Sequence, residues 1–197
     1  MNYAGFWPRF WALLIDALVM LPFGILSFGI ESFSKTAALI STIPFTALFY
    51  SYNIFFHAKW GQTLGKMATR VKVVKVDGSS ISWKNAVLRS SVDILVATLD
   101  TISRIIALSK ISNENYLAYD WTERMDRLSE LQPDMLNWVL PLGFLWTFSE
   151  IVVLLTNKKK RALHDFIAGT VVIDLKDDTI RGKKESIPSL PDRGGLV

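Results

Sequence analysis

The sequence has no cysteine among its 197 residues, which excludes disulfide bonds, thiol chemistry and thiolate metal sites. It has only two histidines, His57 and His164, and they lie too far apart to show the spacing of a zinc-binding motif. It also contains no recognisable catalytic triad. We therefore expect a protein that is not an enzyme and that uses no cofactor or metal.

What the sequence has in quantity is hydrophobic residues, which make up 50% of it, against 20% charged residues. The charges lie between long apolar blocks, which reach the roughly 20 residues that a helix needs to cross a hydrocarbon layer about 30 Å thick. The net charge of +4 would also suit a nucleic-acid-binding protein. However, the basic residues cluster beside the apolar blocks, as they do in membrane proteins. We expect a lipid bilayer as the partner and no nucleic acid.

The apolar blocks predict an all-α membrane domain, a bundle of four transmembrane helices, over residues 1–175. The predicted spans are residues 6–30, 36–57, 85–108 and 135–157. The first block is too long for the apolar part of a signal peptide and lacks a cleavage site, so we expect it to remain as a span. Residues 176–197 are expected to form a flexible cytoplasmic tail whose last four residues resemble the remains of an engineered linker.

The charges of the loops predict the orientation of the bundle. Basic residues are abundant in the central loop, residues 58–84, and in the run Lys158–Arg161, whereas the loop 109–134 is mainly acidic. Basic loops of membrane proteins stay in the cytoplasm. Both chain termini and the central loop are therefore predicted to face the cytoplasm.

Shorter elements are expected between the spans. Val71–Val76 is rich in alternating valines and precedes an Asp77–Gly78 turn, and a second β-forming run, Thr170–Ile173, follows the fourth span. Both lie on the predicted cytoplasmic side and can pair into a small sheet under the bundle. Apolar residues recur at helical spacing between residues 117 and 128, so the outer loop 109–134 is predicted to be partly helical. This helix is interpreted as a lid or, preferably, as a helix in the membrane interface.

Several ionisable residues fall inside the predicted spans, where a charge exposed to lipid costs about 3 kcal/mol or more. In the first span Arg9 and Asp16 face the same side, roughly 10 Å apart along the helix axis. In the fourth span Glu150 lies about two turns inside the cytoplasmic boundary. Such residues are expected to face the interior of the bundle, a water-filled cavity or a partner.

The third span carries four charges, Arg89, Asp93, Asp100 and Arg104. On one continuous helix their directions fall within about 60°, so they form a narrow stripe in which Arg89 pairs with Asp93 and Asp100 with Arg104. Over all spans the acids exceed the arginines by one. The unmatched carboxylate must take up a proton, bind a cation or reach water. The buried charges are interpreted either as structural pairs or as groups that couple ion movement.

Three blocks of the sequence resemble the RDD family of bacterial membrane proteins. The runs Tyr3–Trp11 and Leu14–Asp16 resemble the opening of the family, Gly61–Gly78 resembles its loop, and Arg161–Ile173 resembles its closing element. The family is defined by an arginine at the start of the first span, an aspartate in the middle of that span, and a second aspartate near the C-terminal end.

The resemblance places Arg9, Asp16 and Asp165 in the three defining positions. It implies a multi-pass protein of the bacterial inner membrane. It also implies transport of an unidentified ligand, with cation/proton exchange suggested for some members. A further implication is that Asp165 pairs with Arg9 or with a basic residue of the central loop and so ties the cytoplasmic ends together.

The leading hypothesis is a small transporter or transport subunit that exchanges a monovalent cation, Na⁺ or K⁺, for protons. Asp16 would bind the ion, with Arg9 competing against the cation. Asp93 and Asp100 would line the route, and the two arginines of their span would balance them. A homo-oligomer is expected because four spans are few for a transport pathway. The alternative is a non-transporting membrane scaffold or assembly factor in which the buried charges are structural.

Overall fold

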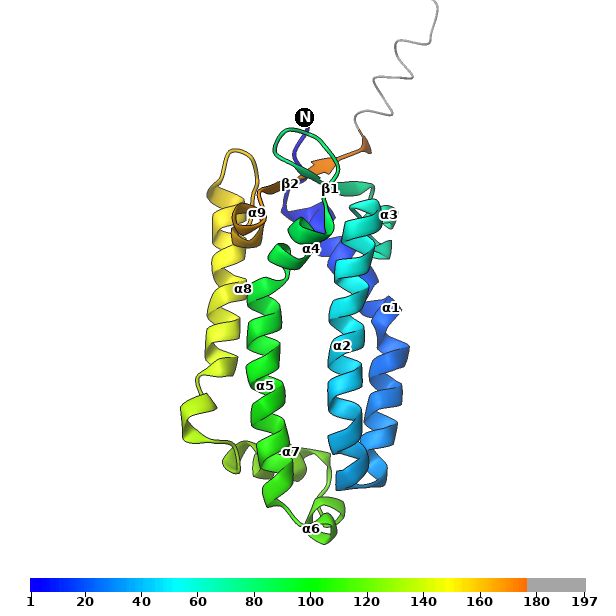
Figure 1. Ribbon diagram of the computed structural model, residues 1–197, viewed down its shortest axis with the longest axis vertical. Coiled ribbons are helices and arrows are strands. Elements are labelled where there is room, and N and C mark those ends of the chain that lie inside the picture. Colours follow the sequence, from blue (N-terminus) through cyan, green and yellow to red (C-terminus); the bar gives the residue numbers. More distant parts are fainter. Residues whose placement is uncertain (177–197) are drawn as a thin grey trace, which may run out of the picture.

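The computed structural model describes residues 1–176 (Figure 1). The predicted tail, residues 176–197, therefore lies outside the described part of the chain except for its first residue. Most of the described chain is helical, and a two-stranded sheet lies at one end of the helices. We refer to that end as the sheet end and to the opposite end as the loop end.

Four long helices run side by side between the two ends (Figure 1). They are α1 (Phe6–Phe33), α2 (Lys35–Trp60), α5 (Ser91–Lys110) and α8 (Val139–Thr156). α1 and α2 form a hairpin because the backbone of Ser34 is extended between them. The Ser34 hydroxyl also accepts a hydrogen bond from the backbone N–H of Ala37, which caps the start of α2.

Three helical stretches of the described chain are long and apolar enough to cross a membrane, namely Phe6–Phe33, Lys35–Trp60 and Asp134–Thr156. Large apolar side chains on them project outward; Leu18 is 67% exposed and Phe144 is 76% exposed. A surrounding lipid layer would remove such side chains from water. α5 is not among the three stretches, because charged residues interrupt its apolar surface.

The prediction that residues 85–108 form one continuous helix is wrong. Two helices cover this region, α4 (Trp83–Arg89) and α5, and they meet at Ser90. α4 begins with a capping box formed by Ser82 and Asn85. It ends in a tight turn in which the backbone N–H of Ser90 donates to the carbonyl of Val87 at 3.1 Å. The four charges predicted to share one stripe are therefore divided between two helices.

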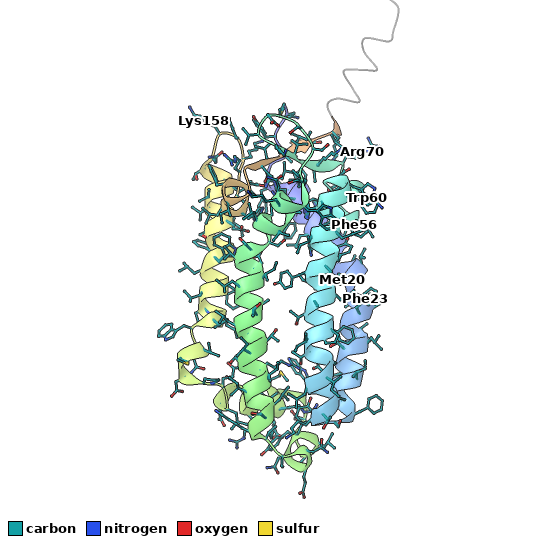
Figure 2. All side chains as sticks on the ribbon, viewed as in Figure 1. Met20, Phe23, Phe56, Trp60, Arg70 and Lys158 are labelled. Atoms are coloured by element: carbon teal, nitrogen blue, oxygen red, sulfur yellow. The ribbon has the colours of Figure 1, made fainter. Side chains whose placement is uncertain are left out.

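The sheet end joins three distant parts of the chain. β1 (Val71–Lys75) pairs antiparallel with β2 (Thr170–Asp174), so the predicted sheet of two short strands is confirmed. The N-terminal segment adds to it, because the backbone N–H of Ala4 donates to the carbonyl of Val172 at 2.9 Å. A buried apolar cluster lies between these segments and consists of Ala4, Val71, Val73, Ile81 and Val172. Figure 2 shows the basic side chains of Arg70 and Lys158 at this end.

The loop end is covered by three short elements, α6 (Asn113–Ala118), α7 (Trp121–Glu130) and the 3₁₀ turn η1 (Asp134–Leu136). Ser112 caps α6 and Asp120 caps α7, so the apolar residues between 117 and 128 belong to two helices and not to one. Tyr116 and Leu128 are buried against the ends of the long helices, in a cluster with Ala38, Ala107, Leu108 and Ile111.

A close contact fastens the short helix α3 (Leu64–Ala68) against α1. Gly65 lies directly on the backbone of Ala12, and a Cβ atom at position 65 would overlap the Ala12 carbonyl oxygen and crowd the Asp16 carboxyl group. Only a residue without a side chain allows α3 to approach α1 this closely.

Gly65→Ala is expected to lower the free energy of unfolding by about 1–3 kcal/mol, because α3 must move away from α1 to make room for the methyl group. The measurement is the thermal unfolding midpoint of the purified protein in detergent. Gly29→Ala is the matched control, because Gly29 lies on α1 with no atom near its missing Cβ. Equal midpoints for the two variants would contradict the assigned contact.

Candidate functional site

A buried carboxylate at the sheet end is the centre of a charged cluster. Asp165, on α9 (Leu163–Ile167), is fully buried. Its two oxygens each receive one arginine: Arg9 Nη1 of α1 donates to Oδ2 at 2.8 Å, and Arg89 Nη1 of α4 donates to Oδ1. The backbone N–H of Ala162 and the hydroxyl of Thr170 also donate to this carboxylate, at 3.0 and 3.1 Å. Asp165 thus joins α1, α4 and α9.

Asp165 is ionised in this setting. Burial alone raises the pKa of Asp165, but the positive charges of Arg89 and Arg9 together hold the pKa below its usual range. The pairing of Asp165 with Arg9 that the family resemblance implied is present. The second arginine, Arg89, was expected to pair elsewhere.

The cluster continues from Arg89 to α8 through a histidine. Arg89 Nη2 donates to His164 Nε2 at 2.8 Å, and His164 Nδ1 contacts a carboxylate oxygen of Glu150. Because arginine has only donors, Nε2 must be the acceptor of the ring, and Nδ1 then carries the hydrogen that points to Glu150. This network assigns a neutral His164 that connects Arg89 to Glu150.

The carboxylate of Asp16, on α1, is surrounded by hydrogen-bond donors of the chain. It accepts hydrogen bonds from the Tyr52 hydroxyl of α2 at 2.7 Å, from the Thr63 hydroxyl at 2.5 Å and from the backbone N–H of Gly65 at 2.7 Å. Within the described residues it forms no ion pair with Arg9, whose guanidinium is directed to Asp165. Asp16 therefore fastens α1 to α2 and α3.

The two ion pairs predicted within the third span, Arg89 with Asp93 and Asp100 with Arg104, do not occur among the described residues. The break at Ser90 turns Arg89 toward Asp165. Arg104 Nη2 instead donates to Glu31 of α1 at 2.5 Å. Sequence reasoning missed this partner because the first span was predicted to end at residue 30, whereas α1 continues to Phe33 and so includes Glu31.

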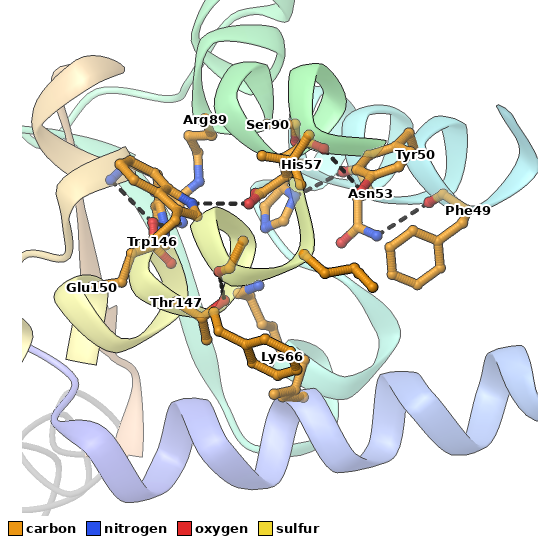
Figure 3. A pocket seen from close by; sticks show the side chains of 17 residues that line it. Phe49, Tyr50, Asn53, His57, Lys66, Arg89, Ser90, Trp146, Thr147 and Glu150 are labelled. Atoms are coloured by element: carbon orange, nitrogen blue, oxygen red, sulfur yellow. Dashed lines mark hydrogen bonds and ion pairs between the residues drawn. The ribbon is translucent and has the colours of Figure 1, made fainter. Parts of the chain in front are cut away.

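A cavity of about 570 Å³ opens between the long helices, next to this network (Figure 3). Leu13 of α1, Tyr50 of α2, Val96 of α5 and Trp146 of α8 are among the residues that line it. The polar groups lie at its sheet end, where Arg89, Asp93, Glu150 and His164 reach the cavity. Of the predicted site residues, the structure therefore brings Arg89, Asp93 and Glu150 to this cavity, whereas Arg9, Asp16, Asp100 and Arg104 do not line it.

Asp93 is held against α8 and faces the cavity. Trp146 Nε1 donates to its Oδ1 at 3.0 Å, and the Tyr50 hydroxyl of α2 donates to its backbone carbonyl at 3.1 Å. Its second carboxylate oxygen has no hydrogen-bond partner within the described chain and so remains available to the cavity.

Two further groups of the cavity wall lack partners in the described chain. His57 is buried, its Nδ1 donates to the carbonyl of Asn53 at 2.7 Å, and its Nε2 has no partner. Lys66 of α3 points into the cavity (Figure 3) and forms no ion pair. Burial and the nearby positive charge of Arg89, partly opposed by the negative charge of Asp16, lower the pKa of Lys66 to about 8. Sequence reasoning could not single out Lys66, because it is one of several basic residues in the segment between α2 and α4.

Comparison with known proteins gives one family. A family model described as the RDD family matches residues 3–169. A curated relative, the uncharacterized membrane protein YteJ of Bacillus subtilis (strain 168), is 29% identical over 116 residues, which cover 54% of this chain and 71% of YteJ. No solved structure matches the chain.

Asp165→Asn is expected to lower the free energy of unfolding by about 3–5 kcal/mol, because it leaves two buried arginines without their counter-charge. The comparison is with Arg127→Gln, which breaks an exposed ion pair to Glu130 and should leave the stability nearly unchanged. Thermal unfolding of the purified variants in detergent measures both effects. A midpoint for Asp165→Asn within error of the wild type would show that the cluster does not hold the sheet end together.

Lys66 gives the stability a dependence on pH at alkaline values. Its folded-state pKa of about 8 lies below the ordinary 10.5, so the unfolded chain binds this proton more tightly. The contribution of Lys66 to stability therefore rises as the pH increases from about 8 to 10.5. Lys66→Met should remove this rise. Unfolding midpoints of both proteins over this pH window test the effect, and parallel curves would contradict it.

Proposed function

The chain belongs to the RDD family, and from this premise we propose that it is a small multi-pass transporter that exchanges a monovalent cation for protons. The observation that carries the proposal is the cavity between four long helices, with the carboxylates of Asp93 and Glu150 in its wall. In a bundle with an apolar outer surface, ionisable groups that face an internal cavity are typical of ion and proton pathways.

The proposed topology has four spans with the sheet end in the cytoplasm. The basic loop residues concentrate at the sheet end, as expected for a cytoplasmic face; they are Lys59, Arg70, Lys72, Lys75, Lys84 and Lys158–Arg161. The N-terminal segment and β2 both lie at this end, so the two ends of the membrane domain would be cytoplasmic. This orientation suits the inner membrane of a bacterium.

We propose that α5 is the fourth span. Its 20 residues correspond to about 30 Å of helix, the thickness of a hydrocarbon core. The cost of its charges is reduced by their surroundings, because Asp93 faces the cavity and accepts a hydrogen bond from Trp146, and Arg104 is paired with Glu31.

The proposed exchange uses competition for carboxylate oxygens. A carboxylate binds either a proton or a cation, so a site that alternates between the two and opens to opposite sides couples their movements. Asp93 and Glu150 suit this role better than Asp16, because Asp16 is occupied by three donors of the chain and lies away from the cavity. Arg89 and Lys66 in the same wall would repel a second cation.

A membrane scaffold is the second candidate function. It is favoured by the Arg9–Asp165–Arg89 cluster, whose ion pairs join α1, α4 and α9 and are explained by a structural role alone. On this view the cavity has no role, and the basic residues of the sheet end bind a cytoplasmic partner. The two candidates differ in what substitution of a cavity carboxylate would do.

The test is proton flux into proteoliposomes that contain the purified protein, driven by imposed Na⁺ or K⁺ gradients. Asp93→Asn and Glu150→Gln are each expected to reduce cation-dependent flux about tenfold or more, because loss of one charged ligand weakens ion binding by about 1.5 kcal/mol or more. Asp126→Asn, an exposed acid of α7, is the matched control and should leave the flux unchanged.

All variants must first elute as single species at the wild-type volume in size-exclusion chromatography. If the folded wild-type protein produces no flux with either cation, the exchange proposal fails and the scaffold is favoured. If cation-dependent flux is unchanged in both Asp93→Asn and Glu150→Gln, the protein is a transporter but these two carboxylates are not its ion-binding site.

A further inference from the structure

A second cavity, of about 390 Å³, lies at the loop end of the bundle, between α5, the end of α7 and the start of α8. Its polar lining consists of side chains with oxygen atoms, namely Asp100, Ser103, Ser129, Glu130, Gln132 and Asn137. No lysine, arginine or histidine lines it. Carboxylate, hydroxyl and amide oxygens are the ligands that hard cations prefer in proteins.

One buried polar atom in the wall of this cavity, the side-chain oxygen of Ser103, lacks a hydrogen-bond partner in the described chain. The side chain of Ser103 is 1% exposed. Hydroxyls in a helix usually donate to a carbonyl of their own helix. Thr98 and Ser109, also on α5, do so, with bonds of 2.7 Å to Ile94 and 2.6 Å to Ile106. Ser103 does not, although it lines the cavity.

The charge of the cavity wall amounts to one uncompensated carboxylate. Glu130 is neutralised by an ion pair with Arg127 at 2.7 Å. Asp100 has no ion pair within the described chain, because Arg104, one turn along α5, is paired with Glu31 of α1. A partly buried carboxylate without a counter-charge is expected to attract a single positive charge.

From these observations we propose that the second cavity binds a monovalent alkali-metal cation through the Asp100 carboxylate and the Ser103 hydroxyl. The single uncompensated charge matches a monovalent ion better than a divalent one. Gln132 and Asn137 line the same wall, and each has a side-chain amide oxygen that can serve as a further ligand.

The role of this site in transport rests on the proposed function. Asp93 and Asp100 are seven residues apart on α5, which corresponds to about 10 Å along the helix. Leu140 of α8 lines both cavities and so marks the place where they adjoin. In this scheme the second cavity is a binding site on the loop-end side. The cation binds there first and then moves past Leu140 into the cavity lined by Asp93.

The experiment is equilibrium binding of ²²Na⁺ to the purified full-length protein in detergent, with choline chloride to keep the ionic strength constant. Saturable binding is expected for the wild type. Asp100→Asn should weaken it about tenfold or more, and Ser103→Ala should weaken it by a smaller factor, because a neutral hydroxyl contributes less than a carboxylate. Asp126→Asn, which alters an exposed acid at the same end, should bind like the wild type.

Equal binding by the wild type and a folded Asp100→Asn variant would overturn the proposal. If Ca²⁺ or Mg²⁺ displaces ²²Na⁺ at a lower concentration than unlabelled Na⁺ does, the site does not prefer monovalent cations, and that part of the proposal is overturned. Ser103→Ala retains the charge of the wall, so it tests the site even if Asp100→Asn fails to fold. Asp93→Asn separates the two proposals, because it should leave intact the part of the ²²Na⁺ binding that depends on Asp100. Retention of that binding without flux supports both proposals, and its retention with normal flux refutes only the transport site.

Discussion

The assembly of the sheet end depends on the burial of one carboxylate between two arginines. Arg9 and Arg89 together bring two positive charges to Asp165, which supplies only one negative charge. The balance is restored through the neutral ring of His164, beyond which lies Glu150. Two arginines and two acids thus form one neutral group that spans α1, α4, α8 and α9. Because each member would be costly to bury alone, the helices that carry them are held in one arrangement.

The lengths of the apolar blocks were enough to predict a helical membrane domain. The alternating valines were enough to predict the two paired strands. The resemblance to a family added the contact between Arg9 and Asp165. The partner of Arg89 was not predictable, because the stripe of charges assumed one continuous helix, and the break at Ser90 is set by a tight turn with no proline or glycine to signal it. Glu31, the partner of Arg104, was missed because α1 is longer than its apolar block and continues past the predicted end of the first span.

The ionisable residues of the bundle divide into two groups with different surroundings. Arg9, Asp16 and Asp165 have their polar atoms bonded to other parts of the chain, so they hold helices together. Asp93 and Asp100 each line a cavity and keep at least one oxygen free of partners in the described chain. Residue type and spacing do not distinguish the two groups, because the distinction depends on which donors the folded chain brings within reach.

The sheet end also has a consequence for biosynthesis. The segment around Ala4 is synthesised before the helices of the domain, yet it bonds to Val172 of β2, which follows all of these helices in the described chain. Until then Arg9 and Arg89 lack Asp165, and β1 lacks its partner strand. The long helices are therefore all synthesised before the sheet end can close, and the segment that carries Asp165 and β2 completes the assembly last.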